Sequence, residues 1–240
     1  MTMKIDILET GSSKGNSLLI DDKIMIDMGL PYKYIGKKLE QAELILITHR
    51  HGDHINIPAL RKLDKLKPWK LKNVLYCNRD VAEKIENSHN SKFDFVVPQD
   101  HIISDHDSFQ FESEDDIYDI DTFPCVHDVE NQGFVITKNN EEHLLFATDT
   151  STIEFAPMHI KYDYIMLEGN YDEDILNDAI QFGSDDQVYR ASQNLRHLSI
   201  QDYEQFVKNQ GTDNCISIQL HESDTFGRQS GVKSIGRERI

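Results

Sequence analysis

Short hydrophobic runs recur along the whole chain and are separated by polar stretches. The run Leu44–Ile47 is uniformly apolar, which is typical of a buried strand. Other apolar or alternating runs predict strands at residues 1–8, 18–20, 23–28, 73–77, 94–97, 101–104, 108–112, 119–126, 133–136, 144–150, 164–168 and 215–221. Helical stretches are predicted at 34–42, 58–67, 78–87, 172–182 and 200–209. The mixture of strands and helices indicates an α/β protein.

Several helix ends carry local signals. Pro58 suits the first turn of a helix and Pro68 ends it. Asn78 is a suitable N-cap for the helix that follows. Ser199 is another, with Asp202 three positions later.

A cluster of histidines follows the strand at 44–47. His49 and His51 alternate, so on an extended strand end both point the same way, and Gly52 lets the backbone turn so that Asp53 and His54 come back toward them. A buried strand rarely ends in such a cluster without a cation to neutralise it. Imidazole and carboxylate together suit zinc, manganese or iron rather than calcium. The remaining histidines lie in polar contexts and are predicted on the surface: His89, His101, His106, His143 and His159.

Length and composition favour one domain. A chain of 240 residues with 38% hydrophobic and 28% charged residues can bury one core and is too short for two domains of this kind, so we expect a single domain over residues 1–240. Cys77, Cys125 and Cys215 are odd in number and widely spaced, which does not suggest a disulfide framework. The start of the chain lacks the apolar core of a signal peptide, and no stretch approaches the roughly 20 apolar residues of a membrane span. A cytoplasmic location is therefore expected.

The formal net charge of −17 disfavours a long nucleic acid as partner, because such proteins usually present a basic face to the phosphates. The exception is the basic segment 61–72, shortly after the histidine cluster. It is interpreted either as a solvated helix face or as a local attractor for one phosphate group. The tail at 224–240 has no clear periodicity.

The pattern His-x-His-x-Asp-His after an apolar strand resembles the signature of the metallo-β-lactamase fold hydrolases. The resemblance implies an αββα sandwich, with two mixed β-sheets flanked by helices. It also implies a binuclear site with two divalent metal ions, most simply Zn²⁺ with Mn²⁺ as the alternative. The implied metal ligands, all at strand ends or in the cluster, are His49, His51, Asp53, His54, His127, Asp149 and His221. Asp53 would also orient the attacking water.

The same resemblance assigns supporting residues near the metals. Asp27 ends the strand at 23–28, where the family has an aspartate that hydrogen-bonds the metal loop. The Gly-Ser-Ser-x-Gly-Asn segment resembles the first loop of the phosphodiesterase branch, where that loop borders the pocket, so Asn16 becomes a candidate pocket residue. An ordinary hairpin connection is the alternative interpretation of that segment.

Two later elements also resemble the phosphodiesterase branch. Glu168 at a strand end and His197 before a helix correspond to the family's Glu-Ala-Thr and Gly-His-Ser-Thr elements, in which the Glu orients a His against the scissile phosphate. The resemblance makes His197 a hydrogen-bond or proton donor to the leaving group and Glu168 its support. Gly169 and Asn170 replace the small residue and threonine. Arg196 replaces the glycine, which places a cation beside the expected phosphate.

The substrate prediction rests on size and charge. His127 and Asp149 are only 22 positions apart, which leaves no room for the long arm that RNase Z enzymes often carry in this interval to grip transfer RNA. We therefore predict a phosphodiesterase for a small nucleotide, most simply a 3′,5′-cyclic nucleotide. It looks similar to the compact phage enzymes that act as homodimers against Pycsar defence, which would place it in a host cytoplasm. The alternatives are a single-stranded DNA or RNA nuclease with the same site, a lactone or thioester hydrolase, and a metal-binding scaffold without turnover.

Overall fold

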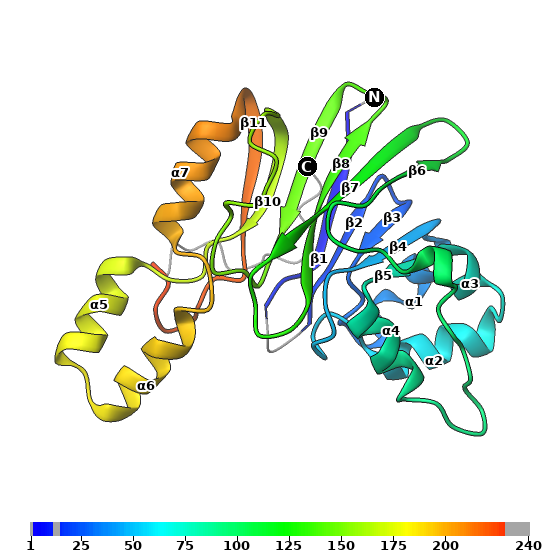
Figure 1. The fold of residues 1–240 in the computed structure, drawn as a ribbon, viewed down its shortest axis with the longest axis horizontal. Coiled ribbons are helices and arrows are strands. Elements are labelled where there is room, and N and C mark those ends of the chain that lie inside the picture. The colour runs from blue at the N-terminus through cyan, green and yellow to red at the C-terminus, as the bar shows by residue number, and fades with distance from the viewer. Residues whose placement is uncertain (1, 12–14, 229–240) are drawn as a thin grey trace. The chain divides into compact units, whose positions relative to one another are not determined.

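The computed structural model describes residues 2–11 and 15–228. The described chain divides into two compact units (Figure 1). Unit 1 contains the residues up to 107 together with 113–115, and unit 2 contains 108–112 and the residues from 116 onward. Each unit is described by itself. The single domain predicted for residues 1–240 stays a prediction.

Unit 1 is built on a five-stranded mixed sheet. Its strands are β1 (Ile5–Glu9), β2 (Ser17–Ile20), β3 (Ile24–Ile26), β4 (Leu44–Ile47) and β5 (Leu75–Cys77), in that spatial order. The first three strands pair antiparallel, whereas β3, β4 and β5 pair parallel. The helices of this unit are α1 (Tyr32–Gln41), α2 (Ile57–Leu66), α3 (Lys70–Val74), α4 (Arg79–Glu86) and the short η1 (Gln99–His101).

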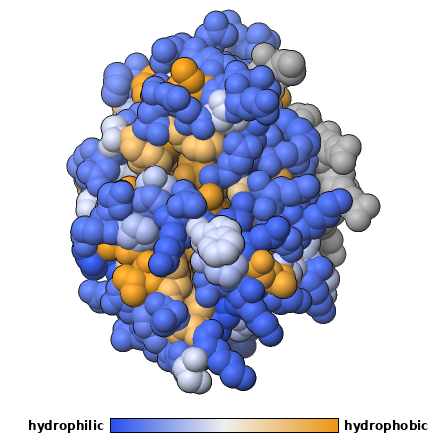
Figure 2. Space-filling model, turned by 90° about the vertical axis from the view of Figure 1, so that its right-hand side faces the viewer, coloured by the Kyte–Doolittle hydropathy of each residue, from blue (hydrophilic) through white to orange (hydrophobic). Residues whose placement is uncertain are grey.

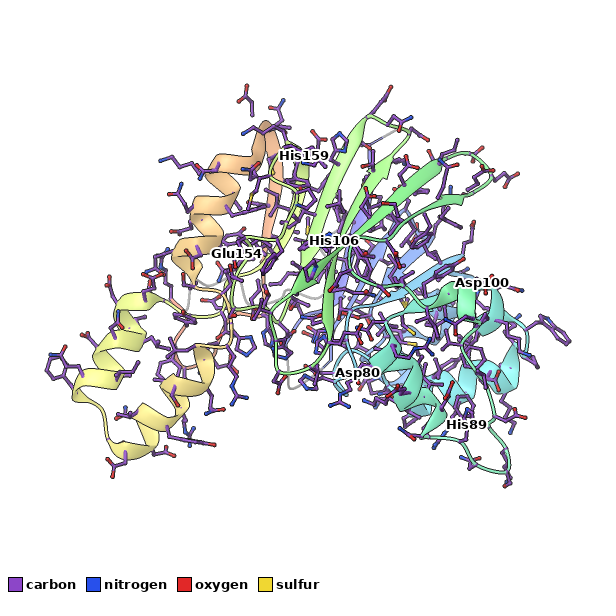
Figure 3. The ribbon with its side chains drawn as sticks, in the orientation of Figure 1. Asp80, His89, Asp100, His106, Glu154 and His159 are labelled. Atoms are coloured by element: carbon purple, nitrogen blue, oxygen red, sulfur yellow. The ribbon has the colours of Figure 1, made fainter. Side chains whose placement is uncertain are left out.

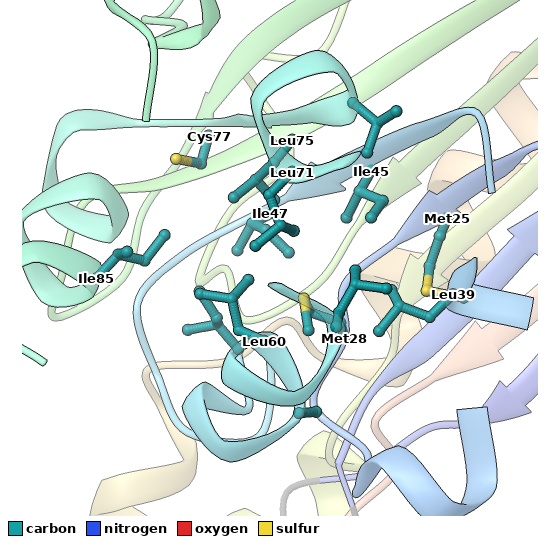
Figure 4. Packing of buried hydrophobic residues seen from close by; sticks show 14 of the residues in the cluster. Met25, Met28, Leu39, Ile45, Ile47, Leu60, Leu71, Leu75, Cys77 and Ile85 are labelled. Carbon is teal, nitrogen blue, oxygen red and sulfur yellow. The ribbon is translucent and has the colours of Figure 1, made fainter. Parts of the chain in front are cut away.

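The core of unit 1 lies where the helices pack on its sheet (Figure 4). Ile45 and Ile47 of β4 belong to this core together with Leu39 of α1 and Leu60 of α2, all almost completely buried. The other two residues of β4 are buried as well, so the strand has no solvent-facing side. That is why four apolar residues follow one another there, as is usual in parallel sheets covered on both faces. A rigid strand thus leads directly into the histidine cluster.

Unit 2 is built on a six-stranded mixed sheet. Its strands are β6 (Ser108–Glu112), β7 (Ile117–Cys125), β8 (Asn131–Lys138), β9 (Glu142–Ala147), β10 (Tyr162–Glu168) and β11 (Gly211–Leu220). They lie in the order β11-β10-β9-β8-β7-β6, antiparallel from β6 to β9 and parallel from β9 to β11. The helices are α5 (Glu173–Phe182), α6 (Asp185–Asn194) and α7 (Ile200–Gln210). Helix α7 contacts β10 and β11, and α5 contacts α6 (Figure 1).

The predicted fold class is confirmed, because the chain forms two mixed sheets flanked by helices. Asn78 accepts a hydrogen bond from the Val81 amide at 3.0 Å, and Ser199 accepts one from the Asp202 amide at 3.0 Å, as their N-cap positions predicted. The hairpin expected between His127 and Asp149 is β8 and β9, joined by a short turn. Among the described helices, none combines the length and the apolar character needed to span a membrane.

Some element predictions were wrong. Residues 70–74 form α3, so the strand expected at 73–77 begins only at Leu75. Residues 94–97 and 101–104, all described, form no strand: Phe95 and Val97 alternate with exposed neighbours and pack into the core, but no strand pairs with them. Helix α6 was not predicted, although Ser184 and Gln187 form a capping box at its start.

Candidate metal and catalytic residues

The histidine cluster of unit 1 folds into a tight loop after β4. The His54 amide donates to the His51 carbonyl at 3.1 Å, which turns the chain back on itself. The turn does not require glycine at position 52, because Gly52 has no positive φ and a Cβ there would meet nothing within 4 Å. The imidazole rings gather as a result: ring centroids lie 4.8 Å apart for His49 and His51, and 4.0 Å apart for His49 and His54. His49 and His54 are completely buried, whereas the Asp53 side chain stays partly exposed.

Asp27, the residue directly after β3, hydrogen-bonds this loop. One carboxylate oxygen accepts from the Thr48 amide at 2.9 Å, and the other accepts from Nδ1 of His54 at 2.7 Å. This contact keeps the proton of His54 on Nδ1 and leaves Nε2 as the nitrogen that can bind a metal. Burial raises the pKa of Asp27, and the contacts with His54 and Thr48 offset only part of that rise. Asp27 has a left-handed backbone (φ 60°), a conformation often found at functional positions.

Asn16 also reaches the loop, although residues 12–14 of its own segment lie outside the described part. Its side-chain amide lies 2.9 Å from Nε2 of His54 and 3.3 Å from a carboxylate oxygen of Asp53. Its backbone amide donates to the Asp53 carbonyl at 2.6 Å. Gly29 lies directly against that carbonyl, because a Cβ added at Gly29 would stand 1.6 Å from the Asp53 oxygen. Backbone contacts therefore fix the loop as firmly as its side chains do.

Two further residues of unit 1 hold the loop and were not predicted to do so. Besides capping α4, Asn78 donates from its side-chain amide to the Thr48 carbonyl at 3.1 Å. Asp80 at the start of α4 pairs with Arg50 at 3.1 Å (Figure 3). Asparagine in a cap position is a sequence signal for the first role, whereas the contact with Thr48 depends on the tertiary structure.

Unit 2 brings four predicted site residues together. Asp149 follows β9, Glu168 ends β10 and His221 follows β11, so three neighbouring parallel strands deliver them at one edge of the sheet. His197 comes from the turn before α7. The candidate ligand atoms of these four residues all lie within 4.8 Å of one another. Asp149 (φ 54°) and His221 (φ 55°) both have left-handed backbones.

Glu168 is the centre of this group. Its Oε1 accepts from Nδ1 of His197 at 2.6 Å and from Nδ1 of His221 at 2.8 Å, and its Oε2 accepts from the Thr150 amide at 2.8 Å. The side chain is completely buried. Burial alone would raise the pKa of Glu168, but the hydrogen bonds and charges of the two histidines outweigh burial and lower it. The pKa of His197 is raised. Burial alone would lower it, but the hydrogen bond and charge of Glu168 more than compensate.

Two asparagines of unit 2 support this group and were missed in the sequence. Asn131 at the start of β8 donates to the carbonyls of Thr148 and Asp149 at 2.9 and 2.7 Å. Asn170 donates to the His221 carbonyl at 2.7 Å. Each therefore holds the backbone of a left-handed residue. The sequence signal that could have identified Asn170 is that it stands where the family pattern has a threonine. No local pattern distinguished Asn131.

The last two predicted residues lie beside the same group. The His127 and His197 ring centroids are 5.8 Å apart. Nε2 of His127 lies 3.1 Å from Oδ1 of Asp128, and the other oxygen of Asp128 lies 3.8 Å from the half-exposed Arg196. Arg196 is thus linked to His127 through Asp128, a residue that sequence reasoning did not select.

The donor sets of both units fit divalent metal ions. Unit 1 offers imidazoles and one carboxylate in a single loop, and unit 2 offers the Asp149 carboxylate and the His221 imidazole, with candidate ligand atoms within 4.8 Å of each other. Nitrogen and carboxylate oxygen together suit Zn²⁺ or Mn²⁺. The carboxylates of Asp27 and Glu168 hold Nδ1 of the predicted ligands His54 and His221, the usual support for a metal-binding imidazole. The assignment of each ligand to an ion stays a prediction.

Comparison with known proteins agrees with this chemistry. A family model described as the beta-lactamase superfamily domain matches residues 27–202. The chain therefore belongs to the beta-lactamase superfamily, the metallo-β-lactamase fold hydrolases, and the predictions of this family and of a metal-dependent hydrolase are confirmed.

Three individual proteins are similar to this chain over most of its length. Over 217 residues the chain is 30% identical to the exodeoxyribonuclease WalJ of Streptococcus pneumoniae strains D39 and R6, a match that covers 83% of this chain and 73% of the relative. Its fold is similar to that of the metallo-beta-lactamase fold protein YhfI from Bacillus subtilis, with a TM-score of 0.64, 15% identity, and coverage of 93% of this chain and 88% of that one. It is also similar to the short form of human tRNase Z, with a TM-score of 0.62, 17% identity, and coverage of 92% and 93%.

Proposed function

We propose that this protein is a metal-dependent phosphodiesterase that hydrolyses DNA strands. The observation that carries the proposal is the double contact of Glu168, which fixes a predicted metal ligand, His221, and the predicted proton donor, His197, through the same oxygen. With Nδ1 held by the carboxylate, His197 presents Nε2 to a substrate. The leaving oxygen of a phosphodiester needs a proton, and the protonated imidazole of His197, whose pKa is raised by Glu168, can donate it from Nε2.

The proposal assigns the metal ligands as the sequence predicted them. In this proposal His49, His51 and His127 would hold the first ion, Asp53, His54 and His221 would hold the second, and Asp149 would be shared by both. When bound, such ions polarise phosphoryl oxygens and lower the pKa of a coordinated water. The protein itself contributes three things: Asp27 and Glu168 orient the imidazoles, Asp53 orients the attacking water, and Arg196 attracts the phosphate.

DNA is the leading substrate because the relative at 30% identity is named an exodeoxyribonuclease and its match spans most of this chain. The solved structures support the fold alone. A nuclease also fits the basic segment 61–72, which a hydrolase of uncharged lactones or thioesters does not need.

A cyclic nucleotide is the second candidate. Two observations favour it: the β8–β9 connection is a short turn without an inserted arm, and the net charge is −17. The predicted small substrate, the homodimer, the anti-Pycsar role and the cytoplasmic location stay predictions.

One panel of substrates tests both candidates. The purified protein, supplied separately with Zn²⁺ and Mn²⁺, is incubated with end-labelled single-stranded and double-stranded DNA, RNA, 3′,5′-cyclic nucleotides, a lactone and bis(p-nitrophenyl) phosphate. Shortening of DNA from one end supports the proposal. Hydrolysis of cyclic nucleotides with intact DNA would favour the second candidate, and bound metal without hydrolysis of any diester would favour a non-catalytic scaffold.

A further inference from the structure

The helices of unit 1 carry a surface that the proposed site does not use. We define the basic helical surface by four exposed residues of α2 and the turn before α3: Lys62, Lys65, Lys67 and Trp69. Figure 2 views the molecule from the side on which α2 and α3 lie in Figure 1. On that face hydrophilic residues predominate and hydrophobic ones occupy small separate areas.

The charge of this region is opposite to that of the chain. Residues 61–72 contain six basic and one acidic side chain, so their net charge is +5. The remaining residues carry −22, which gives the chain its net charge of −17. Two of the six basic side chains hydrogen-bond to backbone carbonyls: Arg61 donates to that of Ser88, and Lys70 donates to that of Ala42 at 2.5 Å. The other four are exposed lysines, at 62, 65, 67 and 72. The ammonium of Lys62 lies 4.6 Å from the centre of the Tyr32 ring. A local concentration of cations on a strongly acidic protein indicates an anionic partner.

The aromatic residue of the surface indicates the kind of anion. Trp69, the chain's only tryptophan, is 75% exposed, and Leu66, three positions before it, is exposed as well. Tryptophan is usually well buried, so an exposed one among lysines points to a contact surface. An exposed flat ring with lysines on either side of it in the sequence is a composition that single-stranded nucleic acids bind, with a base stacked on the ring and phosphates on the cations.

A lipid surface fits less well. A membrane-surface helix needs a continuous apolar face. In α2 the apolar face, with Ala59, Leu60 and Leu63, is buried in the core of unit 1. Only Leu66 and Trp69 remain to enter a membrane.

The position of α2 relates this surface to the predicted ligand loop. The helix begins three residues after His54 and contains ten residues, so it is about 15 Å long at 1.5 Å per residue. Lys65, Lys67 and Trp69 lie at its far end. About four or five stacked nucleotides span this distance at roughly 3.4 Å each.

We propose that the basic helical surface binds single-stranded nucleic acid, with Trp69 stacking on a base and the lysines contacting phosphates. The distance of four or five nucleotides from the cleaved bond rests on the proposed function, whereas binding itself does not. The surface would act as a second contact that holds a strand while its end is hydrolysed.

The intrinsic fluorescence of Trp69 tests the contact directly. Single-stranded oligonucleotides of three to fifteen nucleotides are titrated into the full chain in EDTA, so that no cleavage occurs. Stacking should quench the emission. In parallel, anisotropy of a labelled oligonucleotide measures the affinity of Trp69→Ala and Trp69→Phe. The alanine variant should bind about fivefold or more weakly, and the phenylalanine variant should bind like the wild type.

A charge-matched pair of variants tests the lysines. K65E/K67E removes two phosphate contacts, which should lower the slope of log K against log salt by about 1.4, since each contact with a single strand contributes about 0.7. R190E/K208E makes the same change of charge at exposed positions of α6 and α7 and should keep the wild-type slope.

The outcomes separate this inference from the proposed function. Quenching by oligonucleotides that remain uncut in Zn²⁺ or Mn²⁺ would support the surface and count against DNA hydrolysis. Unchanged fluorescence, equal affinity of the alanine variant, or equal slopes for the two double variants would overturn the inference, even if DNA is hydrolysed. It would also be overturned if anionic phospholipid vesicles shift the emission and oligonucleotides do not.

Discussion

Replacing Glu168 by glutamine is the sharpest test of the catalytic group. The shapes match, but glutamine has one acceptor oxygen where the carboxylate has two. If that oxygen takes the place of Oε1, the new NH₂ group faces the Thr150 amide. If it takes the place of Oε2, the NH₂ group faces Nδ1 of both His197 and His221. A buried donor then faces another donor in either orientation.

The magnitude follows from these contacts. A buried unsatisfied donor costs about 1–3 kcal/mol, and losing the negative charge weakens each remaining histidine contact by roughly 1 kcal/mol. A total of about 3–5 kcal/mol corresponds to a loss of kcat/KM of about 150-fold to 5,000-fold. Because the carboxylate also orients His221, bound metal should decrease as well.

The assay is hydrolysis of bis(p-nitrophenyl) phosphate, with metal content measured by mass spectrometry on the same samples. Glu154→Gln is the matched control, since Glu154 is an exposed residue between β9 and β10 (Figure 3). It should keep wild-type rates. Histidine-labelled NMR spectra should show loss of the Nδ1–H form in Glu168→Gln only. Wild-type kcat/KM and full metal content in that variant would refute the role of Glu168.

Three further predictions follow from the structure. Gly29→Ala should lower the melting temperature by about 4–10 °C, because its Cβ collides with the Asp53 carbonyl. Gly52→Ala should leave the melting temperature unchanged, because a Cβ there meets nothing within 4 Å. Equal melting temperatures for the two variants would contradict this packing. Asn131→Asp should reduce hydrolysis at least tenfold by placing a carboxylate against two carbonyls, whereas the exposed Asn140→Asp should match the wild type in rate. Dialysis against EDTA should abolish hydrolysis and lower stability by about 2.7 kcal/mol relative to metal at 100 times its Kd, with recovery in Zn²⁺ or Mn²⁺; full activity in EDTA would exclude a metal-dependent reaction.

Much of this architecture has a local cause and could be predicted. Leu44–Ile47 is a strand because an uninterrupted apolar run can be buried on both faces. Asn78 and Ser199 begin helices because their side chains accept hydrogen bonds from amides only three residues away. The histidine loop turns through an equally local contact, the hydrogen bond from the His54 amide to the His51 carbonyl. Such interactions need no distant partner, so the sequence alone contains them.

The predictions that were wrong concern residues whose environment depends on distant parts of the chain. Phe95 and Val97 alternate with exposed residues as in a strand, yet in the described part of the chain no strand pairs with residues 94–97. His101 was expected on the surface, but it is buried, with its ring stacked 3.9 Å from that of Tyr76 and its Nδ1 at 3.1 Å from the Leu75 carbonyl. A polar neighbourhood in sequence did not predict its environment in space.

The sequence by itself determined the family, the fold class and the residue types of a metal-dependent hydrolase, because strand patterns, helix caps and the histidine cluster are written within a few residues of one another. Only the tertiary structure decided that Glu168 holds two histidines at once and that Asn131 and Asn170 hold left-handed backbone at Asp149 and His221. These contacts join residues 18 to 53 positions apart. They exist because the parallel pairing of β9, β10 and β11 brings the ends of those strands to one edge of a sheet.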